Sequence, residues 1–354
     1  MTRIYGEYQK SRENKAEKRS ARDLSFHEKR YHIDTFWYVV VLPLISKLLS
    51  ACAKRSLFRI LFRNVKPVAM SKFYVIPTFL HLAVFTTFSF LFGTSCETLF
   101  AQDAKVTYPR AVAVDGDSLL VVDLDLPGIW KVTGDKSELY LKGTKLLRKP
   151  MNRPFCVIPK PGGGILVGDS ATREVYAVEK ANGELKPLTD GHIGIPMALA
   201  VDADGKNIYV GDAEKRAVFQ IPIEGGKPEL IVRVNARGLS FDEDGNLWAI
   251  TPDAEAVQKI DVKAKKATVV VKDRPYKFPN GLTWAGDIGY VTDTYTNSVW
   301  TFTADGKTEK WFEGDSLKRP VGIASNEKSV FVADPLRKQI VELDRKTKEA
   351  KDRL

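Results

Sequence analysis

The chain has 354 residues, of which 44% are hydrophobic, and a formal net charge of +10. A chain of this length and composition can bury a sizeable core, so a globular fold is the default expectation. The charge is uneven, because residues 1–69 hold 15 Lys and Arg against 6 Asp and Glu, whereas residues 102–354 hold 38 against 37. Nucleic-acid backbones are bound by concentrated basic surfaces, so a nearly neutral C-terminal part argues against a nucleic-acid partner.

The first hundred residues contain a stretch that is typical of export. Residues 73–93 carry no formal charge, Lys72 precedes them, and the small residue Ala101 follows shortly after. These are the parts of a secretory signal, although the stretch is also long enough for a spanning helix. We therefore expect residues 70–101 to be a signal peptide or a membrane anchor, and the protein to be periplasmic or secreted, or else membrane-anchored through residues 73–93.

The basic leader of residues 1–69 allows two interpretations. Residues 1–34 are charged and aperiodic, which is typical of disorder. Because Met70 directly precedes the signal, Met70 is favoured as the true start, with residues 1–69 not translated. Alternatively, residues 36–49 form a second membrane segment behind a basic cytoplasmic tail.

The C-terminal part consists of six repeats of about 42 residues, which is the length of a propeller blade. Each repeat opens with Pro, or with Ala236 in the fourth, followed by a variable residue, a small residue and an aliphatic residue, and a second apolar strand follows about 14 residues later. Alternating third and fourth strands come after short Gly-containing turns. Four short strands per repeat predict an all-β fold, a six-bladed β-propeller of four-stranded antiparallel blades over residues 102–354.

Closure of the ring is expected to use the start of the domain. The last residues, KTKEAKDRL, are highly charged and do not resemble a strand, whereas AKVTY before the first repeat does. We therefore expect residues 104–108 to supply the fourth strand of the last blade, which would remove an open sheet edge.

Comparison of the repeats separates scaffold from site. The second strand ends in Asp in five of six repeats, and Thr251 stands in the remaining one. A residue needed by every blade is structural, so these carboxylates are expected to accept backbone N–H groups of the following turn. The residue after each opening Pro differs between repeats and should ring the mouth of the central channel, as a ligand site grafted on a repeated scaffold would. These six candidates for ligand binding are Arg110, Phe155, Met197, Arg237, Asn280 and Val321.

The chemistry of these six residues suits a small polar or anionic ligand with an apolar part. Two guanidinium groups and one amide would bind the polar group, and the other three side chains would contact the apolar part. The alternative is that Arg110 and Arg237 only neutralise nearby turn carboxylates such as Asp123 and Asp293.

The repeats resemble the NHL-repeat and gluconolactonase (senescence-marker, regucalcin-like) propellers, most closely in FPNGLTWAGDIGYVTDTYTNSVW, residues 278–300. The resemblance implies metal-dependent lactone hydrolysis with a central divalent cation, calcium or zinc, for which Asn280 matches one ligand. The following repeat has Val321 where the family has Asp, and Val cannot bind a hard cation. The family's early Glu ligand and its Arg-x-Asn-Asp passage are also absent.

Three functions remain open at this stage. The first is an exported binding module, expected to be a monomer, that takes a small molecule or a protein partner at the channel mouth. The second is a divergent hydrolase or lyase with Asn280 in an incomplete metal site. In that case His192, the only histidine after residue 101, is the candidate general base. The third is an interaction platform of the NHL kind.

Overall fold

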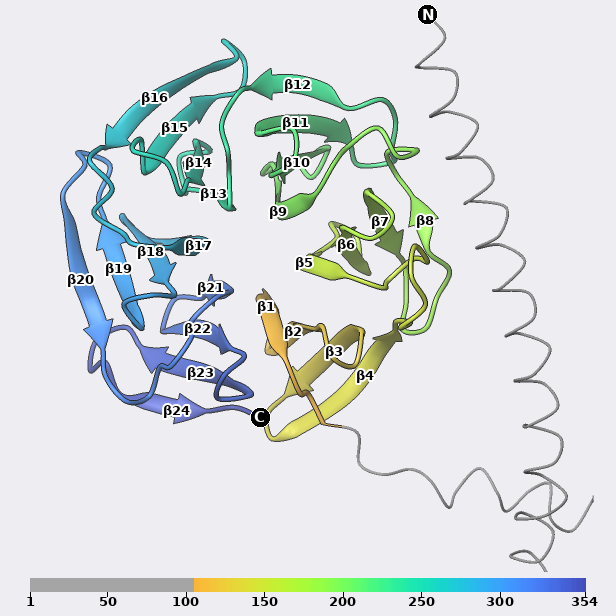
Figure 1. Ribbon diagram of the computed structural model, residues 1–354, viewed down its shortest axis with the longest axis horizontal. Coiled ribbons are helices and arrows are strands. Elements are labelled where there is room, and N and C mark those ends of the chain that lie inside the picture. The colour runs from red at the N-terminus through yellow and green to blue at the C-terminus, as the bar shows by residue number, and fades with distance from the viewer. Residues whose placement is uncertain (1–104) are drawn as a thin grey trace, which may run out of the picture. The chain divides into compact units, whose positions relative to one another are not determined.

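The computed structural model describes residues 105–354, which form six four-stranded antiparallel sheets arranged as the blades of a ring (Figure 1). Each blade is built from consecutive strands that run from the centre of the ring outward. The first three blades are β1 (Pro109–Asp115), β2 (Ser118–Asp123), β3 (Gly128–Thr133), β4 (Lys136–Lys142), β5 (Pro154–Pro159), β6 (Ile165–Asp169), β7 (Glu174–Val178), β8 (Lys186–Pro187), β9 (Pro196–Val201), β10 (Asn207–Asp212), β11 (Ala217–Pro222) and β12 (Glu229–Val232).

The other three blades complete the ring and confirm the predicted six-bladed propeller. Their strands are β13 (Gly238–Phe241), β14 (Leu247–Ile250), β15 (Val257–Asp261), β16 (Lys266–Val271), β17 (Pro279–Ala285), β18 (Ile288–Asp293), β19 (Ser298–Phe302), β20 (Thr308–Glu313), β21 (Ile323–Ser325), β22 (Ser329–Asp334), β23 (Gln339–Asp344) and β24 (Ala350–Asp352). Within residues 105–354, no helix is long and apolar enough to cross a bilayer.

The hydrophobic core lies between blades. One cluster joins Leu120 and Val122 of the first blade to Val157 and Val167 of the second. Five further clusters fill the other junctions around the ring, including the one between the sixth and first blades. Fully burying one such aliphatic side chain stabilises a fold by about 1.5–3 kcal/mol, so stacking of blades is the main source of stability.

Burial decreases from the centre of each blade to its rim. Every residue of β2 is buried, whereas β4 in the same blade is buried only at Leu141. The inner strands have a neighbouring blade on both faces, while the outer strands meet water along their free edge. This gradient explains why the inner strands are apolar and the outer ones are rich in Lys and Glu.

The predicted closure of the ring is wrong. Residues 105–108 form no strand, and the fourth strand of the sixth blade is β24, from the charged C-terminal segment. All three residues of β24 are exposed, so an outer strand tolerates charge that an inner strand would not. Ion pairs reinforce it, since Arg337 Nη2 lies 2.9 Å from Asp352 Oδ2, and Arg353 Nη1 lies 2.8 Å from Glu342 Oε2.

Residues 105–108 instead attach to the first blade. The backbone N–H groups of Thr107 and Tyr108 donate to the Asp123 carboxylate at 2.6 and 3.2 Å. Val106 is buried in the cluster between the sixth and first blades, and the side chain of Leu354 packs against the same cluster. The C-terminus and β1 therefore meet at this junction (Figure 1), which is closed by packing rather than by a shared sheet.

The propeller has a complete core of its own. Residues 105–354 belong to one compact unit, and all six clusters of buried apolar side chains lie within it. We therefore expect a fragment of residues 97–354 to fold independently. The leader of residues 1–69 and the signal or anchor of residues 70–101 lie outside the described residues, and those two predictions stay predictions.

Candidate functional site

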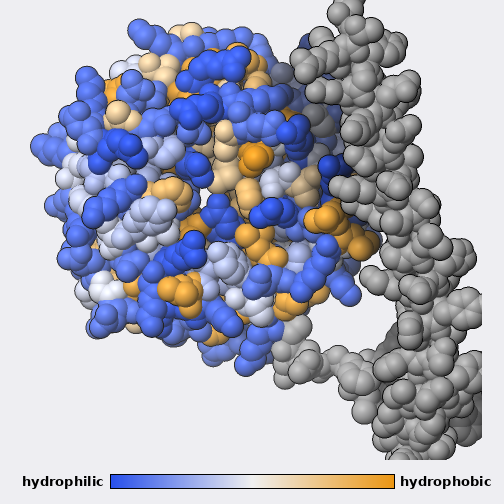
Figure 2. Space-filling view, in the orientation of Figure 1, coloured by the Kyte–Doolittle hydropathy of each residue, from blue (hydrophilic) through white to orange (hydrophobic). Residues whose placement is uncertain are grey.

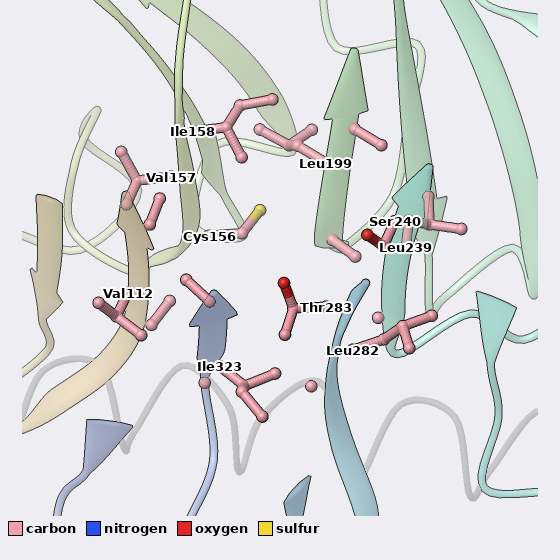
Figure 3. A pocket seen from close by; sticks show the side chains of 18 of the residues that line it. Val112, Cys156, Val157, Ile158, Leu199, Leu239, Ser240, Leu282, Thr283 and Ile323 are labelled. Atoms are coloured by element: carbon pink, nitrogen blue, oxygen red, sulfur yellow. The ribbon is translucent and has the colours of Figure 1, made fainter. Parts of the chain in front are cut away.

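A cavity of about 430 Å³ occupies the centre of the ring and is lined by all six inner strands. Each inner strand contributes the residue that follows the opening Pro or its equivalent, together with the next few residues. Figure 3 shows side chains such as Val112, Leu199 and Ile323 around this space. No Asp, Glu or His lines the cavity, and its charged residues are Arg110 and Arg237.

The repeated aspartates hold the loops that frame the cavity mouth. All five are fully buried. Asp212 accepts hydrogen bonds from four backbone N–H groups, those of Gly194, Ile195, Glu214 and Lys215, at 2.5 to 3.1 Å. The same carboxylate therefore fixes the turn after its own strand and the loop that leads into the inner strand. This confirms that the repeated Asp is structural.

Thr251 performs a reduced version of this role in the fourth blade. Its Oγ1 accepts the N–H of Asp253 at 3.1 Å and donates to the carbonyl of Glu255 at 2.8 Å. A single hydroxyl thus organises one turn but does not bond to the preceding loop. The exception in the repeat pattern is accordingly a weaker variant of the same structural device.

All six predicted mouth residues line the one cavity, as the repeat comparison expected of their position. They come together because each inner strand begins at the same end of the ring. Met197 and Val321 are buried, whereas the other four are partly exposed. Their role in ligand binding is a separate matter from this placement and stays a prediction.

Arg110 lies beside an aromatic ring at the mouth. Its guanidinium carbon is 5.2 Å from the centre of the Phe155 ring, within cation–π distance. Removal of water from the guanidinium is the main effect and lowers the pKa of Arg110. Cys156 and Tyr108 oppose this shift, and the positive charges of Arg237 and Arg319 add smaller contributions that lower the pKa further. The cation is therefore held where water is scarce and where other cations already lie.

Arg237 has the same character. Its guanidinium carbon is 5.9 Å from the centre of the Phe278 ring, and its buried Nε has no hydrogen-bond partner among the described residues. Burial lowers the pKa of Arg237, with Asp253 acting against this shift and Arg216 adding to it. A desolvated donor without a partner is costly to the fold, which is unusual for a residue that serves only structure.

Neutralisation of the turn carboxylates does not explain these arginines. Asp293 accepts the N–H groups of Lys277, Phe278 and Tyr295, and Asp123 likewise accepts backbone donors. Among residues 105–354, no ion pair joins Arg110 or Arg237 to any carboxylate. Both positive charges at the mouth are thus left for another partner.

Asn280 is linked to the sixth blade through a threonine of its own blade. Its Nδ2 donates to Thr294 Oγ1 at 2.5 Å, and that hydroxyl donates to the carbonyl of Pro320 at 2.7 Å. The bond holds the amide in place at the cavity wall and leaves its Oδ1 without a hydrogen-bond donor among the described residues. Asn280 is therefore a fixed polar group between the two last inner strands.

The cavity does not suit a divalent cation. Calcium needs six to eight oxygen ligands, and zinc sites use Cys, His and carboxylates. The cavity supplies one amide and a few hydroxyl groups beside two arginines. Within the described part of the chain, no three His, Cys, Asp or Glu side chains come together to hold a metal ion. The metal site that the family resemblance implied around Asn280 is not formed.

His192 is not brought to the cavity. It is exposed in the loop after β8 and is absent from the cavity lining. Its carbonyl accepts a hydrogen bond from Lys215 Nζ at 2.5 Å, on the outer surface of the mouth loops. The expectation that His192 reaches the channel as a general base has no geometric support.

Sequence reasoning missed the hydroxyl groups deeper in the cavity. Thr283 Oγ1 lies 2.8 Å from Ser325 Oγ, across the junction of the fifth and sixth blades. Ser240 Oγ accepts the backbone N–H of Trp284 at 3.1 Å. Figure 3 shows Ser240 and Thr283 on the cavity wall, among aliphatic side chains. The missed signal was their position three residues after the mouth residue, where the other blades have Ala or Ile.

Cys156 belongs to the cavity wall but is chemically quiet. Burial raises the pKa of its thiol to about 12, and Sγ lies 3.6 Å from the carbonyl of Pro196. A thiol that stays protonated at neutral pH is a poor nucleophile. Cys156 is therefore a buried, inert residue.

Comparisons with known proteins identify the fold. No protein-family model and no curated protein matches the chain. Among solved structures, the nidogen–laminin complex contains a similar chain, with a TM-score of 0.55, 18% identity, and coverage of 65% of this chain and 86% of the other.

Two enzymes are also similar in structure. A catalytically inactive virginiamycin B lyase from Staphylococcus aureus, solved with quinupristin, has a TM-score of 0.54, 16% identity, and coverage of 70% and 85% of the two chains. A gluconolactonase from Xanthomonas campestris has a TM-score of 0.53, 14% identity, and coverage of 65% and 84%. At these identities the likeness defines only the fold. The protein is a six-bladed β-propeller whose structural neighbours include gluconolactonase, nidogen-type and streptogramin B lyase propellers, and the likeness assigns it no activity.

Proposed function

We propose that this protein is an exported β-propeller that binds a small anionic molecule with an apolar part in its central channel. The observation that carries the proposal is the pair Arg110 and Arg237, two desolvated cations at the channel mouth with no carboxylate partner among the described residues. Positive charge held together in this way costs the fold free energy. Binding of an anion would offset that cost.

The wall below the mouth favours an apolar body for the ligand. Most of the lining is aliphatic, and Phe155 stands next to Arg110 at the rim. Asn280 Oδ1 and the Ser240 and Thr283 hydroxyl groups add a few polar contacts. Small-molecule sites typically combine an apolar wall with a small number of such groups.

Export is part of the proposal and rests on the sequence alone. The uncharged stretch of residues 73–93 and the small residue that follows it support a periplasmic or secreted protein, or one anchored in the membrane. We propose that the propeller acts as a monomer.

Metal-dependent hydrolysis is not proposed. It would need a ligand set that the cavity lacks and a base that His192 does not provide there. The two enzymes that share the fold are therefore guides to architecture only.

A matched pair of fluorescent probes tests the proposal. 1-Anilinonaphthalene-8-sulfonate and N-phenyl-1-naphthylamine share their aromatic rings and differ in the sulfonate. We expect the purified fragment of residues 97–354 to bind the sulfonate at least about tenfold more tightly than the uncharged analogue, since charged hydrogen bonds contribute about 1.5–3 kcal/mol each.

Substitutions at the channel mouth test whether the preference for the sulfonate probe arises there. Arg110→Gln and Arg237→Gln should each remove most of it, whereas Arg153→Gln should not, because Arg153 is an exposed arginine of the same loops and lies outside the cavity. Equal binding of both probes by the unmodified protein, or loss of the preference in Arg153→Gln alone, would overturn the proposal.

A further inference from the structure

The near neutrality of the propeller conceals a separation of charge between its two faces. The mouth face consists of the loops that join second to third strands and outer strands to the next inner strand. Those loops carry 16 Lys and Arg against 7 Asp and Glu, a net +9. The loops of the opposite face carry 11 against 14, a net −3. One face is therefore strongly basic.

Exposed apolar side chains gather on the same face. Of the six large hydrophobic side chains that are exposed in residues 105–354, only Leu230 lies on an outer strand. The other five lie in mouth-face loops of the fifth, sixth and first blades, which are consecutive in the ring: Leu126, Leu146, Leu147, Tyr295 and Leu336. Figure 2 shows apolar side chains on one face as small patches among hydrophilic ones.

The loop of residues 143–153 concentrates both properties. Its tip reads Lys-Leu-Leu-Arg-Lys from Lys145 to Lys149, and the whole loop contains four basic residues and no acidic one. Leu146 and Leu147 are 67% and 84% exposed. Two adjacent leucines exposed to this extent leave apolar surface in water, and exposed apolar patches typically mark interaction sites.

The base of this loop is firmly held, so the projection is built into the fold. Met151 is fully buried, and its N–H donates to the Asp169 carboxylate at 3.2 Å. Thr144 N–H donates to the Met151 carbonyl at 3.3 Å, and Asn152 Nδ2 donates to the Thr144 carbonyl at 3.0 Å. These bonds close the loop below its tip and leave Leu146 and Leu147 outside.

We propose that the mouth face docks on an anionic lipid bilayer, with Leu146 and Leu147 inserted among the headgroups and the surrounding Lys and Arg paired with lipid phosphates. Basic residues are attracted to anionic bilayers, and apolar side chains at their tips enter the interfacial region. A bilayer accepts protruding leucines without a matching pocket. Single-stranded nucleic acid would instead favour several aromatic residues on which bases can stack, and Tyr295 is the one aromatic residue among the five exposed apolar side chains of this face. This surface lies outside the channel and does not require the channel to bind a ligand.

The point at which the chain enters the ring also agrees with docking of the mouth face on a bilayer. Residues 105–108 enter the ring on the mouth face, where they bond to Asp123 at the end of β2. In the sequence, the uncharged stretch of residues 73–93 ends only 11 residues before Lys105. Eleven residues span at most about 40 Å, which bounds the distance between such an anchor and the point where the chain enters the ring.

Co-sedimentation with vesicles tests the docking surface. The fragment of residues 97–354 lacks the stretch of residues 73–93, so any binding must come from the propeller. We expect it to bind phosphatidylcholine vesicles that contain about one third phosphatidylglycerol at least about tenfold more tightly than pure phosphatidylcholine vesicles, and to be released by high salt.

Paired variants locate the surface. Leu146→Ser/Leu147→Ser and Lys145→Glu/Lys149→Glu should each weaken binding by about tenfold or more. Leu230→Ser, on an outer strand, and Lys180→Glu/Lys263→Glu, on the opposite face, should leave it unchanged. None of these residues lines the cavity, so binding of the anionic probe should persist in all four variants.

Several results would overturn the proposal. One is equal sedimentation of the fragment with neutral and anionic vesicles, or sedimentation with neither. Another is vesicle binding that survives both mouth-face variants. A third is equally tight binding to double-stranded DNA at the same concentration of negative charge, if the leucine variant binds that DNA as tightly as the unmodified fragment does. Loss of vesicle binding with intact probe binding, or the reverse, separates this proposal from the proposed function of the channel.

Discussion

The buried aspartates and the mouth arginines lie at the same end of the same ring but have opposite energetic character. Asp212 is fully buried and accepts four backbone N–H groups. Arg110 and Arg237 are desolvated and have no carboxylate partner within residues 105–354. The aspartates recur in the blades and stabilise them. The arginines are not part of the repeat, and their burial costs the fold free energy. In a repeat protein this contrast distinguishes scaffold from site.

The largest effect is expected from the scaffold. Asp212→Ala leaves four backbone N–H groups without their acceptor and should lower the free energy of unfolding by about 3–5 kcal/mol. Urea unfolding followed by fluorescence measures this. Thr251→Val, which removes the weaker hydroxyl version of the same device, should cost only about 1 kcal/mol. Equal costs for the two variants would contradict the structural role of the repeated Asp.

Among the single substitutions, an intermediate effect is expected at one of two buried groups that titrate at alkaline pH. Burial raises the pKa of both Cys156 and Tyr276 to about 12, from ordinary values of 9.0 and 10.0. The folded protein keeps these protons while the unfolded chain loses them, so stability is intact below pH 9 and falls as pH rises toward 12. Each unit of difference is worth about 1.4 kcal/mol.

Tyr276→Phe isolates one part of this dependence. The variant loses the hydrogen bond between the tyrosine hydroxyl and Thr308, which should cost about 1 kcal/mol at neutral pH. The decline in the free energy of unfolding between pH 10 and 12 should become shallower by on the order of 2 kcal/mol. An unchanged slope would show that folding does not raise the pKa of Tyr276, and the interior around it would then be more accessible to water than the structure indicates.

The smallest effect on stability is expected from the site. Arg237→Met removes a buried Nε that has no hydrogen-bond partner among the described residues, together with a desolvated charge. The free energy of unfolding should stay within about 1 kcal/mol or rise, because a methionine fills similar volume without a polar group. A loss comparable to that of Asp212→Ala would make Arg237 a structural residue and remove the contrast between the two regions.

Internal repetition made most of the fold predictable. Six copies of one pattern fixed the number of blades, the structural Asp and the six mouth positions, because each copy served as a control for the others. Ring closure was mispredicted because β24 is a solvent-exposed outer strand, where charge does not oppose strand formation. Its pairing depends on Arg337 and Arg353, which no local pattern reveals.

The site was predictable in position but not in environment. The spacing of the repeats placed Arg110 and Arg237 at the mouth, yet which neighbours the closed ring brings near decides that neither forms an ion pair within residues 105–354 and that Asp253, near Arg237, is paired with Arg216. The near-zero net charge of residues 102–354 also concealed the basic mouth face, because the sequence does not say which loops share a face. The loop before β9 suggested that His192 lies near the channel, but its side chain is exposed and does not line the cavity.

The central claim is that the unrepeated arginines form an anion site at the channel mouth, and a crystal structure of residues 97–354 with 1-anilinonaphthalene-8-sulfonate tests it most directly. We predict the sulfonate within hydrogen-bond distance of both the Arg110 and Arg237 guanidinium groups, with the rings in the cavity toward Ile323 and Thr283. A sulfonate bound to the basic loop of residues 143–153, with the cavity free of probe, would contradict the account.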